Sequence, residues 1–163
     1  AEGLSTHGGE LHLDGLTSLS DAAAESLSKH EGYELYLDGL KSLSDEAAES
    51  LSKHKVILGL DGLTSLSDAA AESLCKYRGD LRLSGLTSLT DKAAKAFVWH
   101  EGKLSLYGLT NLSDAAAKGL LRHVEGDLSL DLDELPDSAA EILRQHPSFQ
   151  DDDDDEDWDE DDE

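Results

Sequence analysis

Residues 11–21 have the sequence LHLDGLTSLSD, and they open a block that recurs along almost the whole chain. The same frame restarts at Leu35, Leu58, Leu81, Leu104 and Leu128, in steps of 24, 23, 23, 23 and 24 residues. A period of about 20 to 50 residues is typical of repeat proteins, in which each unit buries its apolar edge by stacking on its neighbours. The repeat therefore predicts a solenoid, a single column of stacked units.

Each block predicts a short strand, a turn and a helix, in that order. The opening Leu-x-Leu alternates with the period of a strand, so the leucines point inward and the residue between them points outward. Three blocks continue with Asp-Gly, which predicts a turn in which the glycine takes a positive φ. Ser20-Asp21 then predicts the start of an Ala-rich helix. We expect this helix to end at Lys29 and His30, because cations favour the negative end of the helix dipole.

A strand, turn, helix and return within about 23 residues resembles the leucine-rich-repeat family, and most closely the bacterial variety with planctomycete-like 23-residue repeats. The resemblance covers about residues 1–146 and rests on six copies of the motif. It implies an α/β fold, a right-handed solenoid with a short parallel sheet on the concave face and short Ala-rich helices on the convex face. Many leucine-rich repeats place an asparagine after the strand, and it is absent here. We therefore expect backbone contacts of Gly, Thr and Ser to hold the turn.

Composition divides the chain into residues 1–150 and residues 151–163. The first segment carries 25 acidic and 13 basic residues, whereas the second carries 12 acidic residues and Trp158, half of the net charge of −24. A run of this kind repels itself and has little apolar area to bury, so we expect a disordered acidic tail. The tail has two interpretations: a solubilising segment, or an interaction segment for a basic partner with Trp158 as an aromatic anchor. We expect no nucleic-acid partner, because phosphates would meet a negative surface.

The two ends of the repeat array differ from its middle. Residues 1–7 match the back half of a block, and the chain contains no Met, so we expect a partial first repeat in a fragment or a processed chain. From about residue 128 the last block gains charge and Pro136, which predicts a C-terminal cap with a polar outer face. We expect Pro147 to end the last helix and Phe149 to fold over the open edge of the core. No stretch is typical of a signal peptide or a transmembrane helix, and we expect no membrane partner.

Function is sought where the blocks differ, at the outward positions of the predicted strands. The central column is His12, Tyr36, Gly59, Arg82, Ser105 and Ser129. Tyr and Arg are the side chains that most often anchor protein interfaces. We therefore predict a partner-binding concave face that includes His12, Tyr36, Asp38, Arg82, Lys103 and Tyr107. Val98 and Trp99 replace the Ser and Lys of other blocks, which predicts a second, apolar spot on the helical side.

Three polar rows also recur in the repeat. Six of the seven histidines share one position, namely His7, His30, His54, His100, His123 and His146, and Tyr77 fills the gap. Neighbouring imidazoles could share a metal, but Cys and carboxylate partners are missing from the row, so we expect the histidines to cap helix C-termini. We expect Asp21 and its equivalents to act at helix N-termini. Asp14, Asp38 and Asp61 are expected to shape turns, with a weak calcium site as the alternative.

The sequence predicts neither an enzyme nor a cofactor. Its serines fall at caps and turns, its glycines form no phosphate-binding loop, and no Ser/His/Asp set is unique to one locus. Cys75 stands alone, which excludes an internal disulfide and favours a reducing, cytoplasmic compartment; we expect it to be partly buried and inert. We predict a monomeric, non-catalytic scaffold that binds a protein or peptide. The alternatives are a polyanionic binder of basic partners, acting through the tail, and a structural or designed repeat protein with no natural ligand.

Overall fold

The computed structural model describes residues 9–29, 32–53, 57–123 and 126–150. Within these ranges six strands alternate with six α-helices, which makes the protein α/β. The acidic tail, including Trp158, lies outside the described residues, and so do residues 1–7 and three of the repeated histidines, His7, His30 and His54.

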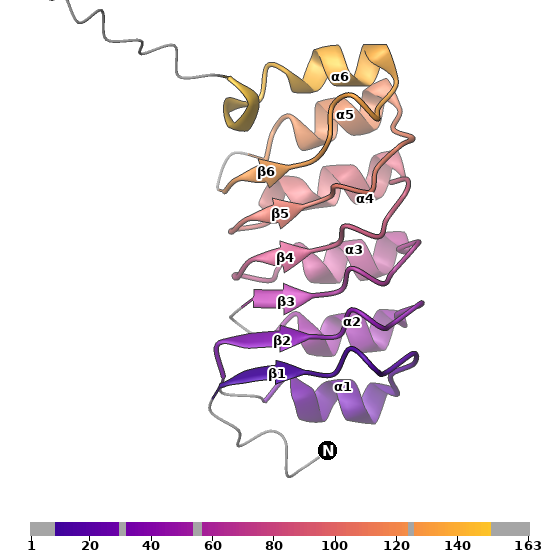
Figure 1. Ribbon diagram of the computed structural model, residues 1–163, viewed down its shortest axis with the longest axis vertical. Helices are drawn as coiled ribbons and strands as arrows, with labels where there is room; N and C mark the ends of the chain where they lie inside the picture. The colour runs from indigo at the N-terminus through magenta and orange to yellow at the C-terminus, as the bar shows by residue number, and fades with distance from the viewer. Residues whose placement is uncertain (1–8, 30–31, 54–56, 124–125, 151–163) are drawn as a thin grey trace, which may run out of the picture.

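The strands form one parallel sheet whose order follows the sequence (Figure 1). They are β1 (Glu10–His12), β2 (Glu34–Tyr36), β3 (Ile57–Gly59), β4 (Leu81–Arg82), β5 (Leu104–Ser105) and β6 (Leu128–Ser129). The first leucine of each block stands opposite the first leucine of the next, as Leu35 does with Leu58. This register confirms the predicted frame of the repeat, including its two 24-residue steps.

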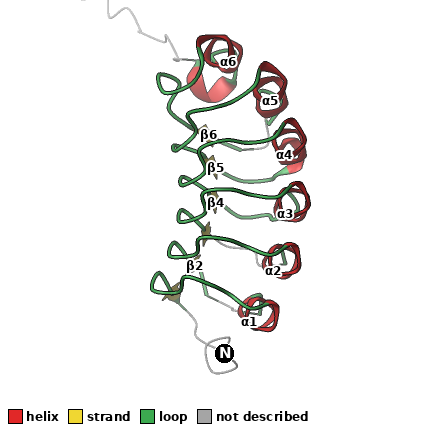
Figure 2. Ribbon diagram, turned by 90° about the vertical axis from the view of Figure 1, so that its right-hand side faces the viewer, coloured by secondary structure: helices red, strands yellow, loops and turns green. Residues whose placement is uncertain are grey.

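The helices form a second layer beside the sheet (Figure 2). They are α1 (Asp21–Leu27), α2 (Asp45–Leu51), α3 (Asp68–Leu74), α4 (Asp91–Ala96), α5 (Asp114–Leu120) and α6 (Asp137–Leu143), with 3-10 turns η1 (Phe97–Trp99) and η2 (Pro147–Phe149). The expectation that the first helix reaches Lys29 and His30 was wrong, because α1 ends at Leu27. A seven-residue helix is about 10 Å long, which matches a three-residue strand, so a longer helix would overrun the sheet.

The core lies between the two layers and is built from leucine on the strand side and alanine on the helix side. Leu35, Leu58, Ala70 and Ala71 are fully buried, and the same holds for their equivalents in the inner blocks. Alanine suits the helix side because it favours helices and adds little width between neighbouring ones. Leu16, whose equivalents in the inner blocks are buried, is 39% exposed, since no described block covers that side of β1 and α1.

The turn glycine after each strand makes room for the neighbouring block. Among the described residues only Gly102 has a positive φ, so the positive φ predicted for the Asp-Gly glycines was wrong. A Cβ atom on Gly62 would lie 2.0 Å from the carbonyl oxygen of Asp38, in the block before. Gly15 has no described block before it, and a Cβ there would meet nothing within 4 Å. The close approach of the preceding block's backbone therefore explains why this position is a glycine.

A ladder of aspartates links the turns of successive blocks. Asp14 Oδ1 accepts a hydrogen bond from Asp38 N at 3.2 Å, Asp38 Oδ1 accepts one from Asp61 N at 2.9 Å, and Asp61 Oδ1 accepts one from Ser84 N at 2.8 Å. We expected backbone contacts of Gly, Thr and Ser to hold these turns and the aspartates to shape them, but the hydrogen bonds from each aspartate to the next block were not predicted. At each of these turns an Asp side chain thus satisfies the backbone N–H of the next block.

A second ladder joins the N-termini of the helices. Ser67 Oγ accepts a hydrogen bond from Ala70 N at 3.0 Å and donates one to Asp45 Oδ1 of the preceding block at 2.5 Å. The same acceptance from a helix N–H is made by Ser20, Ser44, Thr90 and Ser113. The hydroxyl oxygen therefore caps the helix, as predicted. The aspartate in the first turn of each helix from α1 to α4 also accepts a hydrogen bond from the hydroxyl group of the next block. At α6, Pro136 replaces the hydroxyl residue and provides no side-chain cap.

The last strand has its exposed edge covered by a side chain. In the inner blocks a strand N–H donates to the next block, as Leu104 N does to Asp127 O at 2.8 Å. In β6 the equivalent group, Leu128 N, donates to Ser148 Oγ at 3.0 Å. One hydroxyl thus takes the place of the missing neighbouring strand, which blunts a sheet edge that would otherwise be open to pairing.

The η2 segment closes the same end of the core. We expected Pro147 to end the last helix, but α6 already ends at Leu143 and Pro147 begins η2. Phe149 packs against the core, as predicted, with its ring centroid 6.0 Å from that of His146. Within the described part of the chain, no helix is long and apolar enough to cross a membrane.

Candidate binding surface on the sheet

The sheet face, which we define as the outward surface of β1 to β6 and of the residues flanking them, carries all of the predicted partner-binding residues that the structure describes. Parallel pairing places His12 opposite Tyr36, and Gly59 opposite Arg82. The flanking positions add Asp38, Lys103 and Tyr107. The predicted residues therefore share one face, and they separate into two groups by how they are engaged.

The first group consists of His12, Tyr36 and Arg82, whose side chains contact one another. The ring of His12 stacks on the ring of Tyr36, with the two centroids 4.5 Å apart. The guanidinium carbon of Arg82 also lies over the Tyr36 ring, 5.5 Å from its centroid. Arg82 also forms an ion pair with Asp61 at 2.5 Å, while Glu34 accepts a hydrogen bond from the Tyr36 hydroxyl. These contacts hold Tyr36 and Arg82 in fixed positions, so both are less free to reorient toward a partner than the sequence suggests.

The charges around this group shift two pKa values. The hydrogen bond from its hydroxyl to Glu34 raises the pKa of Tyr36 above its ordinary value, because ionisation would break that bond next to a negative charge. Burial by itself would lower the pKa of Arg82, but the hydrogen bond and the charge of Asp61 raise it overall. Tyr36 is therefore a neutral donor, and Arg82 is a permanent cation whose charge is largely compensated by Asp61.

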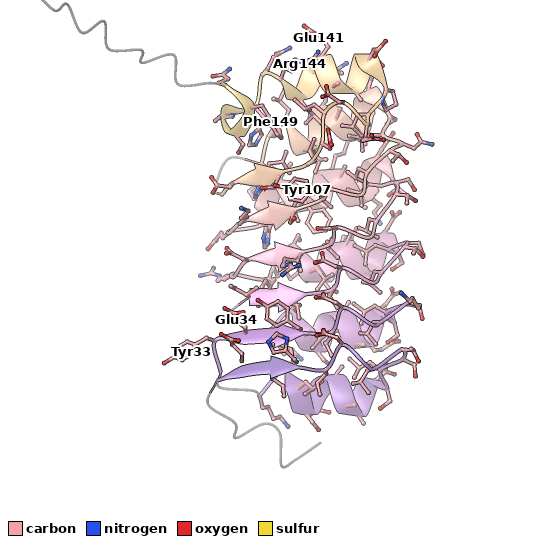
Figure 3. The ribbon with its side chains drawn as sticks, viewed as in Figure 1. Tyr33, Glu34, Tyr107, Glu141, Arg144 and Phe149 are labelled. Carbon is pink, nitrogen blue, oxygen red and sulfur yellow. The ribbon has the colours of Figure 1, made fainter. Side chains whose placement is uncertain are left out.

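The second group, Lys103 and Tyr107, lines an open hollow of about 320 Å³ beside the first group. Lys103 and Tyr107 form one side of it, and Tyr36 and Arg82 form the other. Tyr107 is 57% exposed, and its position over the strand layer is visible in Figure 3. Among the described residues, neither the Lys103 ammonium nor the Tyr107 hydroxyl has a hydrogen-bonding or ion-pair partner. These two groups are available to a ligand.

Five lining residues of the hollow were not predicted as site residues: Ile57, Asp80, Leu81, Ser84 and Ser105. Ile57 begins β3, Asp80 precedes β4, and Ser105 lies in β5 with its Oγ 3.1 Å from Ser84 Oγ. The outward columns of the repeat contain all of these except Leu81, so their position was recoverable from the sequence. Their convergence was not, because the columns do not show where an opening forms. Asp38, a predicted contact, lies outside the lining and serves the turn ladder through Asp61 N.

The described histidines of the repeated row form a buried stack. Ring centroids are 6.4 Å apart from Tyr77 to His100, 5.8 Å from His100 to His123 and 6.3 Å from His123 to His146. Burial lowers the pKa of His100, and it lowers the pKa of His123 to about 4, where the neighbouring imidazoles add to the effect. The predicted role as cations at helix C-termini was therefore wrong for these two, which are neutral rings in the core at pH 7.

Other candidate chemistry is sparse within the described ranges. They contain no group of three or more His, Cys, Asp or Glu side chains suited to a metal ion. The carboxylates of Asp14, Asp38 and Asp61, for which a weak calcium site was the alternative to turn formation, accept the backbone hydrogen bonds of the turn ladder. Cys75 is buried more completely than the partial burial we expected, and this burial raises the pKa of its thiol, which disfavours the reactive thiolate.

No family model matches the chain, and no curated protein matches its sequence. The geometry of its surfaces is the basis for assigning it a function.

Proposed function

We propose that the chain is a leucine-rich-repeat solenoid of the 23-residue bacterial type and that it acts as a non-catalytic scaffold, binding a protein or peptide through the sheet face. The six strand–helix blocks in sequence order support the first part, together with the leucine register between them. The second part rests on one observation: the hollow in the sheet face brings Tyr36, Arg82, Lys103 and Tyr107 together.

The chemistry of the hollow favours a ligand with an acidic group next to an apolar one. Lys103 offers a free cation, and Tyr107 offers an exposed ring with a free hydroxyl. Tyrosine is a common anchor at interfaces because it combines apolar area with one polar tip. Ile57 supplies a half-buried apolar contact between them and Tyr36. A peptide side chain of moderate size fits a hollow of about 320 Å³.

The test is affinity capture from a lysate with the full chain as bait, followed by identification of the retained proteins. The variant Lys103→Ala/Tyr107→Ala should lose the retained proteins, with a melting temperature within about 1 °C of the wild type, since both residues are exposed. The matched control is Tyr33→Ala/Lys41→Ala, which removes the same two residue types. Tyr33 is 76% exposed and projects away from the fold (Figure 3), and neither Tyr33 nor Lys41 lines the hollow. Retention of the same proteins by the Lys103/Tyr107 variant would refute a binding site on the sheet face.

A second candidate function rests on the 12 acidic residues of 151–163. We propose for this segment the binding of basic proteins or peptides, with Trp158 as an aromatic contact. Binding of this kind is electrostatic and weakens steeply with salt. Partners that the wild type loses in high salt, but that Lys103→Ala/Tyr107→Ala retains in low salt, would belong to the segment rather than to the sheet face.

A further inference from the structure

One region of the helix layer departs from the repeat at several positions at once. Four of the six blocks carry Glu at the fifth residue of the helix, whereas α4 and α5 carry Lys95 and Lys118 there. The position that is Lys in three blocks becomes Trp99 and then Arg122. Because these differences fall in two adjacent blocks, their side chains meet on one surface.

The helix-side patch, which we define as Lys95, Val98, Trp99, Lys118, Gly119 and Arg122, lines a hollow of about 400 Å³ between α4–η1 and α5. Trp99 is 77% exposed beside it, as the sequence predicted. Gly119 lies against α4, where an added Cβ would come within 3.1 Å of Lys95 N. The glycine therefore allows α5 to pack closely on α4 beside the hollow, and the exposed Trp99 indole also lines it.

The patch is a site of uncompensated positive charge on a strongly acidic protein. Lys95, Lys118 and Arg122 have no ion pair with any residue that the structure describes. The nearby acids are already engaged. Glu72 pairs with Lys92 at 2.8 Å, Glu101 with Arg78 at 3.7 Å, and Glu141 with Arg144 at 3.2 Å. Three free cations around an exposed indole match an acidic ligand that carries an aromatic ring.

We propose that residues 151–163 of the same chain dock on the helix-side patch, with their carboxylates on Lys95, Lys118 and Arg122 and Trp158 against Trp99. The segment has the matching chemistry, 12 acids and one indole. This proposal does not depend on the function of the sheet face, because the patch lies in the other layer of the fold (Figure 2).

The last described residue before the segment, Gln150, lies beside the end of the last helix. Gln150 Nε2 donates a hydrogen bond to Gln145 O at 3.3 Å. Gln145 occupies in the last block the position of Arg122 and Trp99 in the two blocks before it. Gln150, the last described residue, therefore lies near the C-terminal end of α6, two repeat steps along the stack from Trp99.

The length of the segment is sufficient for this contact. Neighbouring helices pack about 8 to 10 Å apart, so two steps amount to about 20 Å. Trp158 is the eighth residue of the segment, and eight extended residues span at most about 28 Å. A short tether also holds the acids at a high effective concentration near the patch, which allows weak exposed ion pairs to add up.

The test uses the two tryptophans, Trp99 and Trp158, which give two ¹⁹F resonances in the full chain labelled with 5-fluorotryptophan. Trp158→Phe assigns them. In low salt we expect both resonances of the wild type to lie away from their high-salt positions. The variant Lys95→Glu/Lys118→Glu should move the Trp158 resonance in low salt to its high-salt position. Four other blocks carry glutamate at this position, so the variant keeps a residue that the fold accepts, and its circular dichroism spectrum should match the wild type.

The matched control is Lys41→Glu/Lys53→Glu, with the same change of charge in the second block. Lys53 occupies the position equivalent to Trp99, and both lysines are exposed. This control should leave the Trp158 resonance where the wild type has it. A Trp158 resonance that is the same in the wild type, in high salt and in both variants would overturn the proposal. A low-salt resonance that moves on hundredfold dilution would also overturn it, because the contact would then join two copies of the chain.

Discussion

At the scale of single residues, the spacing between blocks decides which side chains the fold tolerates. The turn glycine is the clearest case, since in the inner blocks the space for a Cβ is occupied by a backbone carbonyl. Gly62→Ala should destabilise the protein by about 3 kcal/mol or more, because a rigid backbone atom stands 2.0 Å from the new Cβ. Urea denaturation measures this change.

Gly15→Ala is the matched control for that substitution. It makes the same chemical change at the same position of the repeat, where no atom lies within 4 Å of the new Cβ. Its effect should lie between zero and a stabilisation of about 1 kcal/mol, from the lower entropy of the unfolded chain. Equal destabilisation by the two substitutions would show that the glycine is needed for its backbone conformation and not for close approach.

The buried imidazole of His123 should make stability depend on pH. Its pKa is about 4 in the folded chain and 6.5 as a free side chain. Between these values the unfolded chain binds more protons, so the free energy of unfolding falls as the pH drops below 6.5 and levels off below about 4. The loss between pH 7 and pH 5 should be about 2 kcal/mol from this group. The charges that face the stack, Asp80 and Glu101, act on His100 and raise its pKa, but burial outweighs them.

The variant His123→Phe tests this dependence, because it keeps an aromatic ring in the stack and removes the titrating nitrogens. Its urea-denaturation free energy should fall less than that of the wild type between pH 7 and pH 5. If the wild type and His123→Phe lose stability in parallel, the carboxylates alone account for the acid sensitivity.

At the scale of elements, one hydroxyl serves both the start of its own helix and the contact with the preceding block. Ser67→Ala removes the cap on Ala70 N and the hydrogen bond to Asp45 together. We expect a loss of about 1 to 2 kcal/mol, at the upper end for a helix cap, because the Asp45 carboxylate also loses its donor. Thermal unfolding followed by circular dichroism measures this loss. Ser65→Ala, two residues earlier in the exposed loop, should change stability by less than about 0.5 kcal/mol.

The elements themselves could be predicted from the sequence because local signals and the repeat agree. The alternating leucines predicted the strands, and the hydroxyl residues predicted where the helices begin. The spacing of the repeat predicted the register that pairs Leu35 with Leu58. The helix end was mispredicted because dipole chemistry at Lys29 says nothing about the strand length that the helix must match. The aspartate ladder was missed because a carboxylate near a turn can bond its own backbone or a neighbour's, and only the stacking distance decides between them.

The candidate site was less predictable than the fold, for a physical reason. Outward columns show which side chains share a face, and six predicted contacts do so. They do not show that the charge of Arg82 is compensated by Asp61 while Lys103 has no ion-pair partner among the described residues, because both outcomes fit the same columns. Pairing depends on the directions in which long side chains extend, and the repeat pattern does not determine those directions.

At the scale of the whole molecule, a stack of similar blocks should respond to a mutation according to its place in the stack. Leu63 and Leu16 hold the same position of the repeat, but Leu63 is fully buried between two blocks and Leu16 is 39% exposed at the end. Leu63→Asp would place an unpaired charge in the core, and we expect it to unfold the central blocks and remove most of the helical signal. Leu16→Asp can keep its carboxylate in water, so it should lower the melting temperature by only a few degrees. Circular dichroism of the two variants against the wild type provides the comparison. Equal loss of signal would mean that the chain unfolds as one cooperative unit from either end, whereas a native spectrum for Leu63→Asp would contradict the burial on which the stacked core depends.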